Sequence, residues 1–158
     1  MIKVFGIGNI LLGDDGIGVK VAEKLKEEIE NISSDINVMV GETDYLYCLN
    51  KIEAEDVVVV IDSTYLNINP GFVSYLSFKN CDRFCSNLIF QHESNLLNVL
   101  LREKPNIKGY LIGIEVSKLE FSLELSKTLK DNFDCICLEV IKYIKEIYTD
   151  YARDLYSI

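Results

Sequence analysis

The hydrophobic positions of this 158-residue chain fall into short apolar runs and longer segments with helical spacing. Residues 57–61, VVVVI, are apolar at every position, which is typical of a central strand covered on both faces of a parallel sheet. In residues 17–29 the apolar side chains recur at helical spacing, which predicts an amphipathic helix. The same two patterns predict strands at residues 3–7, 36–40, 72–77 and 109–115, and helices at residues 45–52, 93–102, 123–130 and from 135 to the end.

The order and spacing of these elements predict the topology of the sheet. Only residues 62–71 connect the third strand to the fourth, whereas a parallel crossover needs about a dozen residues or more. We therefore expect the fourth strand to run antiparallel. The remaining order predicts an α/β fold of three αβα layers: a twisted, mixed five-stranded sheet, mostly parallel with one antiparallel strand, with helices on both faces. No linker or repeat interrupts residues 1–158, which favours a single domain.

Ligands of such sheets bind at the carboxyl edge of the parallel strands. The segments expected at that edge are residues 9–15, residues 41–43, Asp62 and Glu115. The first segment belongs to GIGNILLGDDGIG, residues 6–18, a glycine-rich turn between the first strand and the first helix. The turn does not fit dinucleotide binding, because Leu11 replaces the third glycine of the fingerprint and the adjacent Asp14 and Asp15 would repel a pyrophosphate.

The two adjacent aspartates allow two roles. One of them, which we expect to be Asp14, can cap the following helix and interact with the positive end of its dipole. Asp15 is then left to face the cleft. With Asp62 and His92, the single histidine, it forms a set of two carboxylates and one imidazole that a divalent nickel, zinc or iron ion accepts. The alternatives are turn chemistry for Asp62 and a purely structural role for His92.

The net charge, the apolar segments and the cysteines of the chain disfavour several classes of function. The net charge of −9 disfavours binding to nucleic acid and to anionic membranes. No apolar segment reaches the roughly 18 residues of a membrane span, and the start does not resemble a signal peptide, so we expect a cytoplasmic protein. The five cysteines, including the close pairs Cys81 with Cys85 and Cys135 with Cys137, lack the Cys-x-x-Cys spacing of structural zinc sites and are interpreted as reduced thiols.

The chain resembles the nickel–iron hydrogenase maturation endopeptidases along its whole length. The opening signature of that family, G-[IV]-G-N-x-x-x-x-D-[DE]-[GA]-x-G, is matched in full by residues 6–18. Asp62 matches its aspartate at the end of the third strand and His92 its histidine before a later helix, while its late G-I-E … L-S segment is matched at residues 113–115 and 125–126. The resemblance implies an endopeptidase that removes a C-terminal peptide from the large-subunit precursor of a hydrogenase after nickel insertion.

The resemblance also implies the residues of the site. Asp15, Asp62 and His92 would bind the metal and act in catalysis. The nickel would be supplied by the substrate, and the resting protein would be metal-free or bind nickel, zinc or cadmium weakly. No Ser–His–Asp triad or G-x-S-x-G motif is evident, and a Cys81 or Cys85 nucleophile paired with His92 has little support. We therefore expect metal-assisted hydrolysis with either carboxylate as general base.

One segment departs from the family pattern. Where the family often has G-G-T-x-G after the second strand, this chain has Gly41-Glu42-Thr43-Asp44-Tyr45. The resemblance implies that Gly41, Glu42 and Thr43 contribute to substrate recognition, and Glu42 and Tyr45 indicate a different preferred substrate. Three alternatives stay open: a nickel-checking binding module without protease activity, a related processing protease acting on a different (for example spore-associated) substrate, and the less favoured non-haem iron oxygenase.

Overall fold

The structure is a computed structural model that describes residues 1–85 and 96–156, without the side chains of residues 82–85 and 156. In this part of the chain, five strands form one sheet in the order β2-β1-β3-β5-β4. All neighbouring pairs are parallel except β4 and β5, as the short connection before β4 predicted. The strands are β1 (Ile2–Ile7), β2 (Ile36–Glu42), β3 (Val57–Thr64), β4 (Val73–Ser77) and β5 (Lys108–Glu115).

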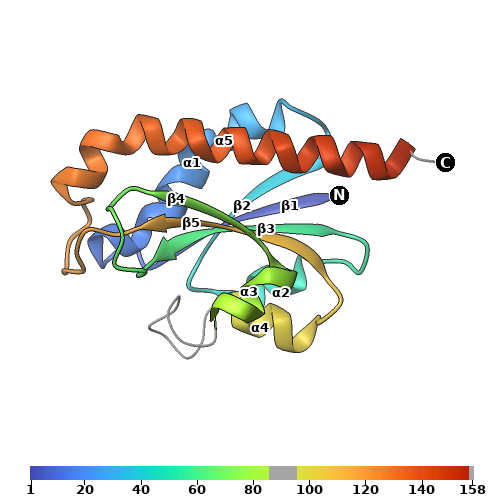
Figure 1. The fold of residues 1–158 in the computed structure, drawn as a ribbon, viewed down its shortest axis with the longest axis horizontal. Coiled ribbons are helices and arrows are strands. Elements are labelled where there is room, and N and C mark those ends of the chain that lie inside the picture. Colours follow the sequence, from blue (N-terminus) through green and yellow to red (C-terminus); the bar gives the residue numbers. More distant parts are fainter. Residues whose placement is uncertain (86–95, 157–158) are drawn as a thin grey trace.

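Helices cover both faces of the sheet (Figure 1). The helices α1 (Ile17–Glu30) and α5 (Lys127–Tyr156) lie on one face. The shorter helices α2 (Tyr45–Asn50), α3 (Phe78–Cys85) and α4 (Leu96–Glu103) lie on the other. This arrangement confirms the predicted three-layer α/β fold.

The central strand β3 explains the continuous apolar run at residues 57–61. Alternate side chains of a strand point to opposite faces of its sheet. Val59 and Ile61 therefore pack in the core beneath α1 and α5, whereas Val58 and Val60 pack in the core beneath α2, α3 and α4. Both faces of β3 are buried, so neither tolerates a polar residue along the length of the run.

The C-terminal region differs from its prediction. The helices expected at residues 123–130 and from residue 135 are one continuous helix, α5, that begins at Lys127. Residues 131–134, three of which are polar, lie between the two predicted helices. However, the buried Leu129, Ile136 and Val140 lie on one helical stripe that packs against the sheet, and this packing outweighs the weak helix propensity of the polar stretch.

Two further elements differ from the sequence prediction. Helix α3 was not predicted, because a segment of eight residues is too short for its helical spacing to be distinguished from that of a loop. Strand β3 runs three residues beyond its predicted end, so Asp62 lies within the strand and pairs with Gly113 of β5. The predicted helix 93–102 corresponds to α4, and its expected start at residue 93 lies outside the described residues.

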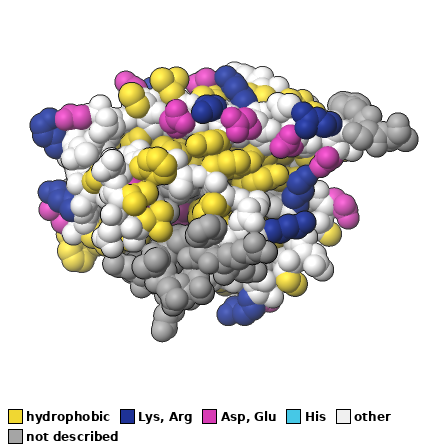
Figure 2. All heavy atoms as spheres, viewed as in Figure 1, with side chains coloured by type: hydrophobic (Ala, Val, Ile, Leu, Met, Phe, Trp, Pro, Cys, Tyr) yellow, Lys and Arg dark blue, Asp and Glu magenta, His cyan; other side chains and the backbone are white. Residues whose placement is uncertain are grey.

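The surface seen in Figure 2 carries hydrophobic side chains along the groove between α5 and β4. Phe72, Val73, Ile136 and Tyr143 line a pocket of about 350 Å³ in this groove. None of the helices in the described part of the chain has the length and apolar character that crossing a bilayer requires.

Candidate active site

The glycine-rich turn brings Asp15 to the carboxyl edge of the sheet by close backbone packing. Gly8 has a φ of 133°, and a Cβ atom there would lie 1.9 Å from the carbonyl oxygen of Asp15. A Cβ atom on Gly18 would lie 2.3 Å from the carbonyl oxygen of Ile61 and 2.5 Å from that of Ile7. The glycines therefore let the start of α1 pack onto the ends of β1 and β3, which is a different task from enclosing a phosphate.

Asp14 does not cap α1, and the prediction that it would is wrong. The N-cap position is Gly16, the last residue of a 3₁₀ turn (Gly13–Gly16), and no side chain caps α1. The buried Asp14 carboxylate instead accepts backbone hydrogen bonds from Ser126 at 2.7 Å, Ser117 at 2.9 Å and Lys118 at 3.2 Å. Asp14 thereby ties the turn to the connection between β5 and α5.

Asp15 faces the opposite way and is held by three donors. Its Oδ2 accepts the backbone N–H of Asn9 at 2.8 Å. Its Oδ1 accepts the hydroxyl of Ser63 at 2.9 Å and the phenol of Tyr65 at 2.5 Å. Because each carboxylate oxygen has two lone pairs, Oδ1 is saturated by these two donors. Oδ2 retains one acceptor direction among the described contacts.

Asp62 lies next to Asp15 in a drier environment. The backbone N–H of Ser63 donates to Asp62 Oδ1 at 2.8 Å, so Ser63 contacts both aspartates. Burial, the largest cause, raises the pKa of Asp62 to about 7; the Ser63 N–H opposes this shift and the charge of Asp15 adds to it. Asp62 therefore exchanges a proton with solvent near neutral pH.

The structure brings Asp15 and Asp62 together, but it does not test the third predicted member. His92 lies outside the described residues. Among the residues that are described, no group of three or more His, Cys, Asp and Glu side chains is arranged to hold a metal ion. The described part of the site thus supplies two carboxylates with free acceptor directions, which fit a divalent cation that brings most of its other ligands with it.

Two tyrosines border the carboxylate pair. The pKa of Tyr65 is raised, first by burial and then by its hydrogen bond to Asp15, so its phenol remains a neutral donor. The pKa of the half-buried Tyr45 is also raised, first by burial and then by the charges of Asp62 and Asp15. Tyr45, from the segment that departs from the family pattern, therefore lies within electrostatic reach of both carboxylates.

Sequence reasoning missed the contribution of the residues that directly follow Asp62. Ser63 and Tyr65 supply two of the three donors to Asp15. The available signal was the run of hydroxyl side chains at residues 63–65, at the end of a strand that otherwise consists of apolar residues up to Asp62. Their contact with Asp15 spans about 50 positions, and no local pattern encodes it.

Glu115 lies at the predicted carboxyl edge of the sheet, but its hydrogen bonds go to the loop that follows β3. The buried carboxylate accepts the hydroxyl of Thr64 at 2.9 Å and the backbone N–H of Leu66 at 2.9 Å. It also accepts a longer bond of 3.4 Å from the backbone of Ile68. Glu115 therefore fixes the turn that follows β3 and, with it, the position of Tyr65.

The predicted recognition segment forms the end of β2 and the start of the turn that follows it. Gly41 is buried where a Cβ atom would lie 2.4 Å from the sulfur of Cys48, whereas Glu42 and Thr43 are exposed. Glu42 has a left-handed backbone with φ 47°, and its carbonyl accepts the N–H of Gly8 at 3.1 Å, which joins this turn to the glycine-rich turn. Gly41, Glu42 and Thr43 are among the residues that line an open pocket of about 300 Å³.

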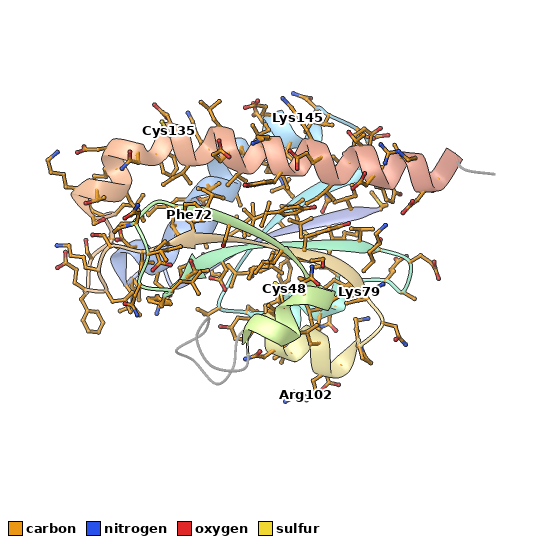
Figure 3. The ribbon with its side chains drawn as sticks, viewed as in Figure 1. Cys48, Phe72, Lys79, Arg102, Cys135 and Lys145 are labelled. Carbon is orange, nitrogen blue, oxygen red and sulfur yellow. The ribbon has the colours of Figure 1, made fainter. Side chains whose placement is uncertain are left out.

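The cysteines whose side chains are described form no competing site. Cys48, Cys81, Cys135 and Cys137 form no disulfide bond with one another. Cys48 lies on the α2 side of the sheet, whereas Cys135 lies on α5 at the opposite face (Figure 3). Burial raises the pKa of Cys48 to about 12 and that of Cys137 to about 11, so both thiols stay protonated near neutral pH. The side chain of Cys85 lies outside the described residues.

Comparisons with known proteins agree with this geometry. Residues 19–143 match the family model described as hydrogenase maturation protease. The chain is 32% identical over 152 residues to the hydrogenase expression/formation protein HupD of Thiocapsa roseopersicina, covering 92% of this chain and 68% of HupD. It is 28% identical over 151 residues to the hydrogenase 2 maturation protease of Escherichia coli K12, covering 92% and 91%.

Solved structures show the same fold. The hydrogenase maturating endopeptidase HybD from Escherichia coli superposes with a TM-score of 0.73 at 25% identity, covering 92% of each chain. The [NiFe] hydrogenase maturation protease HybD from Thermococcus kodakarensis superposes with a TM-score of 0.72 at 22% identity, covering 90% of this chain and 98% of that one.

Proposed function

Because this chain belongs to the hydrogenase maturation protease family and is an endopeptidase, we propose that it removes a C-terminal peptide from the nickel-loaded large-subunit precursor of a nickel–iron hydrogenase. The observation that carries this proposal is the Asp15–Ser63–Asp62 arrangement, in which one serine contacts two buried carboxylates. Nothing neutralises the pair among the described contacts, which favours a cationic partner.

In this proposal the nickel ion is part of the substrate. Among the described contacts, Asp15 Oδ2 and both oxygens of Asp62 keep free acceptor directions, so these are the atoms that would contact the ion. His92 would complete the protein's share of the ligands. Because the protein contributes so few ligands, the resting form is expected to bind nickel, zinc or cadmium weakly. When bound, the ion polarises the scissile carbonyl or the attacking water.

The two carboxylates differ in what they can do with a proton. Asp15 is held in one orientation by three donors, which suits a fixed anionic ligand. Asp62 has a single described donor and, without the ion, a pKa of about 7, so its oxygen that does not contact the ion suits a general base that accepts a proton from water and then gives it to the leaving amine. We therefore assign the proton transfer to Asp62 and the orientation of the substrate ion to Asp15.

The alternative of a side-chain nucleophile has less support. The Ser63 hydroxyl already donates to Asp15, and in this proposal His92 contacts the ion rather than activating a nucleophile. The raised pKa values of Cys48 and Cys137 keep these thiols unreactive near neutral pH.

We assign substrate selection to the turn after β2. Its backbone is joined to the glycine-rich turn through the Gly8–Glu42 hydrogen bond, and the nearby Tyr45 is influenced by both site carboxylates. Glu42 and Thr43 are exposed and lie where a protein substrate approaching the carboxylates would meet them. Replacing glycine by Glu42 adds a charge to this surface, so the preferred precursor is expected to carry a complementary group.

The test is to incubate the purified protein with nickel-loaded and nickel-free forms of a large-subunit precursor and to measure intact masses. The proposal predicts that only the nickel-loaded precursor loses mass, and that the lost fragment has the sequence of the C-terminus. Equal cleavage of both forms would rule out recognition through nickel. Binding of the precursor without loss of mass would favour a nickel-checking binding module instead.

A further inference from the structure

Two neighbouring loops beside the site expose large hydrophobic side chains. Phe121 is 90% exposed and Leu123 is 65% exposed, although both belong to a well-formed segment between β5 and α5. Leu11, from the glycine-rich turn, and Leu119 are exposed as well. We call these four side chains, Leu11, Leu119, Phe121 and Leu123, the apolar rim.

Backbone hydrogen bonds connect the two loops that carry the apolar rim. The N–H of Ser122 donates to the carbonyl of Leu11 at 3.0 Å, and the N–H of Gly13 donates to the carbonyl of Ser122 at 2.8 Å. The buried Asp14 carboxylate adds the bonds to Ser117, Lys118 and Ser126 described above. The apolar rim is thus held rigidly against the turn that presents Asp15.

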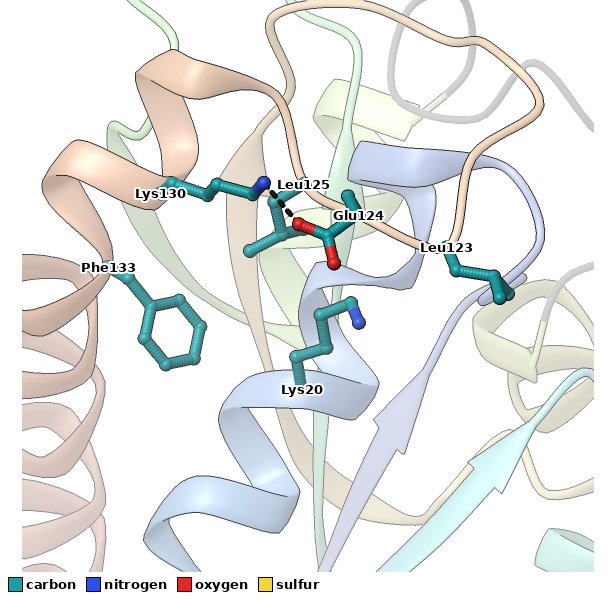
Figure 4. A pocket seen from close by; sticks show the side chains of 6 residues that line it. All are labelled: Lys20, Leu123, Glu124, Leu125, Lys130 and Phe133. Carbon is teal, nitrogen blue, oxygen red and sulfur yellow. Dashed lines mark hydrogen bonds and ion pairs between the residues drawn. The ribbon is translucent and has the colours of Figure 1, made fainter.

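One residue of the apolar rim, Leu123, also lines a pocket (Figure 4). Its volume is about 290 Å³, and its apolar walls are Leu123, Leu125 and Phe133. Lys20 and the ion pair between Lys130 and Glu124 complete the lining. A pocket with three apolar walls and charged groups around them suits one large apolar side chain of a partner.

We propose that the apolar rim and this pocket form the docking surface for an apolar segment of the precursor protein, with one anchor side chain in the pocket. The inference rests on the proposed function, because a protein substrate must bring its scissile bond to Asp15 and Asp62. A standard protein interface covers about 800 Å² on each partner, a patch of about 16 Å radius. Leu11 is four residues from Asp15 and so lies within about 14 Å of it, inside any such patch.

The occupant follows from the same geometry. Exposed phenylalanine and leucine side chains gain most from a partner that removes them from water, and aromatic residues near the centre of an interface contribute most to affinity. The other apolar surface, between α5 and β4, has no described bond to the glycine-rich turn. The apolar rim is therefore the surface that a substrate seated on the carboxylates would cover.

The experiment compares Phe121→Ser and Leu123→Ser with Leu138→Ser. Leu138 is a matched control, because it is 68% exposed and lies on the long helix α5. Immobilised nickel-loaded precursor reports the affinity of each protein, and the intact mass of the precursor reports cleavage. Since all three side chains are exposed, the unfolding temperatures should agree with that of wild type.

The expected result is a rise of about tenfold or more in Kd and KM for Phe121→Ser and a smaller rise for Leu123→Ser. The kcat of both variants and every parameter of Leu138→Ser should stay within about twofold of wild type. If the apolar-rim variants bind and cut as wild type does, the docking surface is wrong while the proposed function stands. If the wild-type protein binds the precursor without cutting it, the proposed function is wrong. The affinities of the variants for the precursor then still decide whether the docking surface is correct. A precursor that wild type does not bind at all overturns both.

Discussion

The buried acidic residues fall into two groups that differ in their hydrogen-bond donors. Asp14 and Glu115 accept mainly backbone N–H groups from segments far away in the sequence, and Asp56 accepts the N–H of Glu53 and pairs with the amino group of Met1. Asp15 has two hydroxyl donors and a free acceptor direction, and Asp62 has one described donor. Asp14 and Asp15 each accept three hydrogen bonds, so neither burial nor the number of donors identifies a functional carboxylate, whereas hydroxyl donors beside a second carboxylate set Asp15 apart.

The difference between the two groups is clearest for the adjacent residues Asp14 and Asp15. They have the same side chain, belong to one short turn and are both buried. The 3₁₀ turn points one carboxylate into the fold and the other to the edge of the sheet. The first accepts the backbone N–H groups of a distant loop, and the second accepts the hydroxyls of Ser63 and Tyr65 beside Asp62. Substitutions at the two groups should therefore have opposite effects on stability and activity.

The largest effect on stability is expected for Asp14→Ala. The substitution leaves the N–H groups of Ser117, Lys118 and Ser126 without their acceptor, which should lower the free energy of unfolding by about 4 kcal/mol. The exposed Asp131→Ala is the control and should stay within about 0.5 kcal/mol of wild type. Urea unfolding measures both, and equal small losses would contradict a structural role for Asp14.

Asp62→Asn should instead stabilise the protein, and only at higher pH. A carboxyl whose folded pKa is raised to about 7 from a model value of 3.8 favours folding when protonated, and this contribution is lost as the pH rises through 7. The amide of the variant carries no charge at any pH, so it removes that loss. We expect a gain of about 2–4 kcal/mol at pH 8 and almost none at pH 4.

The control for Asp62→Asn is Asp56→Asn, in the other group of buried carboxylates. Because Asp56 accepts the N–H of Glu53 and pairs with the amino group of Met1, its substitution should be neutral or destabilising at both pH values. Thermal unfolding at pH 4 and pH 8 measures the two variants side by side. A gain for Asp62→Asn that is equal at both pH values would mean that ionisation of Asp62 is not the cause.

Tyr65→Phe tests the orientation of Asp15 with a smaller expected effect. Losing one hydroxyl donor to Asp15 Oδ1 should slow cleavage about tenfold, while the affinity for the precursor is retained. Tyr75→Phe is the control, because Tyr75 stacks on Tyr110 and Tyr143 away from the carboxylates. Steady-state kinetics separates kcat from KM. A rise in KM alone would place Tyr65 in binding rather than in positioning.

Glu42→Gly should have the smallest effect on stability. Glu42 has a left-handed backbone with φ 47°, which glycine adopts without strain, so the variant should gain up to about 1 kcal/mol. Asn67→Gly is the control, because asparagine at φ 57° tolerates this conformation and should gain less. The same Glu42→Gly variant should change which precursors are cut, measured by competition between two nickel-loaded precursors. Unchanged preference would exclude this turn from substrate selection.

The sequence predicted the framework of the fold because that framework is local. The apolar run at residues 57–61 marks a strand covered on both faces, and a connection of ten residues before β4 excludes a parallel crossover. The place of Asp15 and Asp62 at one edge follows from this topology. Their role as ligands, and the contribution of His92, stay predictions.

The errors concern contacts between distant parts of the chain. Asp14 was predicted as a helix cap, but its donors lie more than 100 residues away, and no local rule anticipates them. Two helices separated by residues 131–134 were predicted, but the apolar stripe of α5 on the sheet keeps the helix continuous. Ser63 and Tyr65 were missed because their hydrogen bonds to Asp15 depend on how β3 meets the glycine-rich turn.

The central claim is that Asp15 acts on the substrate and not on the fold. The most direct measurement is the intact mass of a nickel-loaded large-subunit precursor after incubation with Asp15→Asn, together with the unfolding temperature of the variant. The account predicts no detectable loss of mass and an unfolding temperature close to that of wild type. Cleavage at the wild-type rate, or a variant that unfolds under conditions where wild type stays folded, would contradict it.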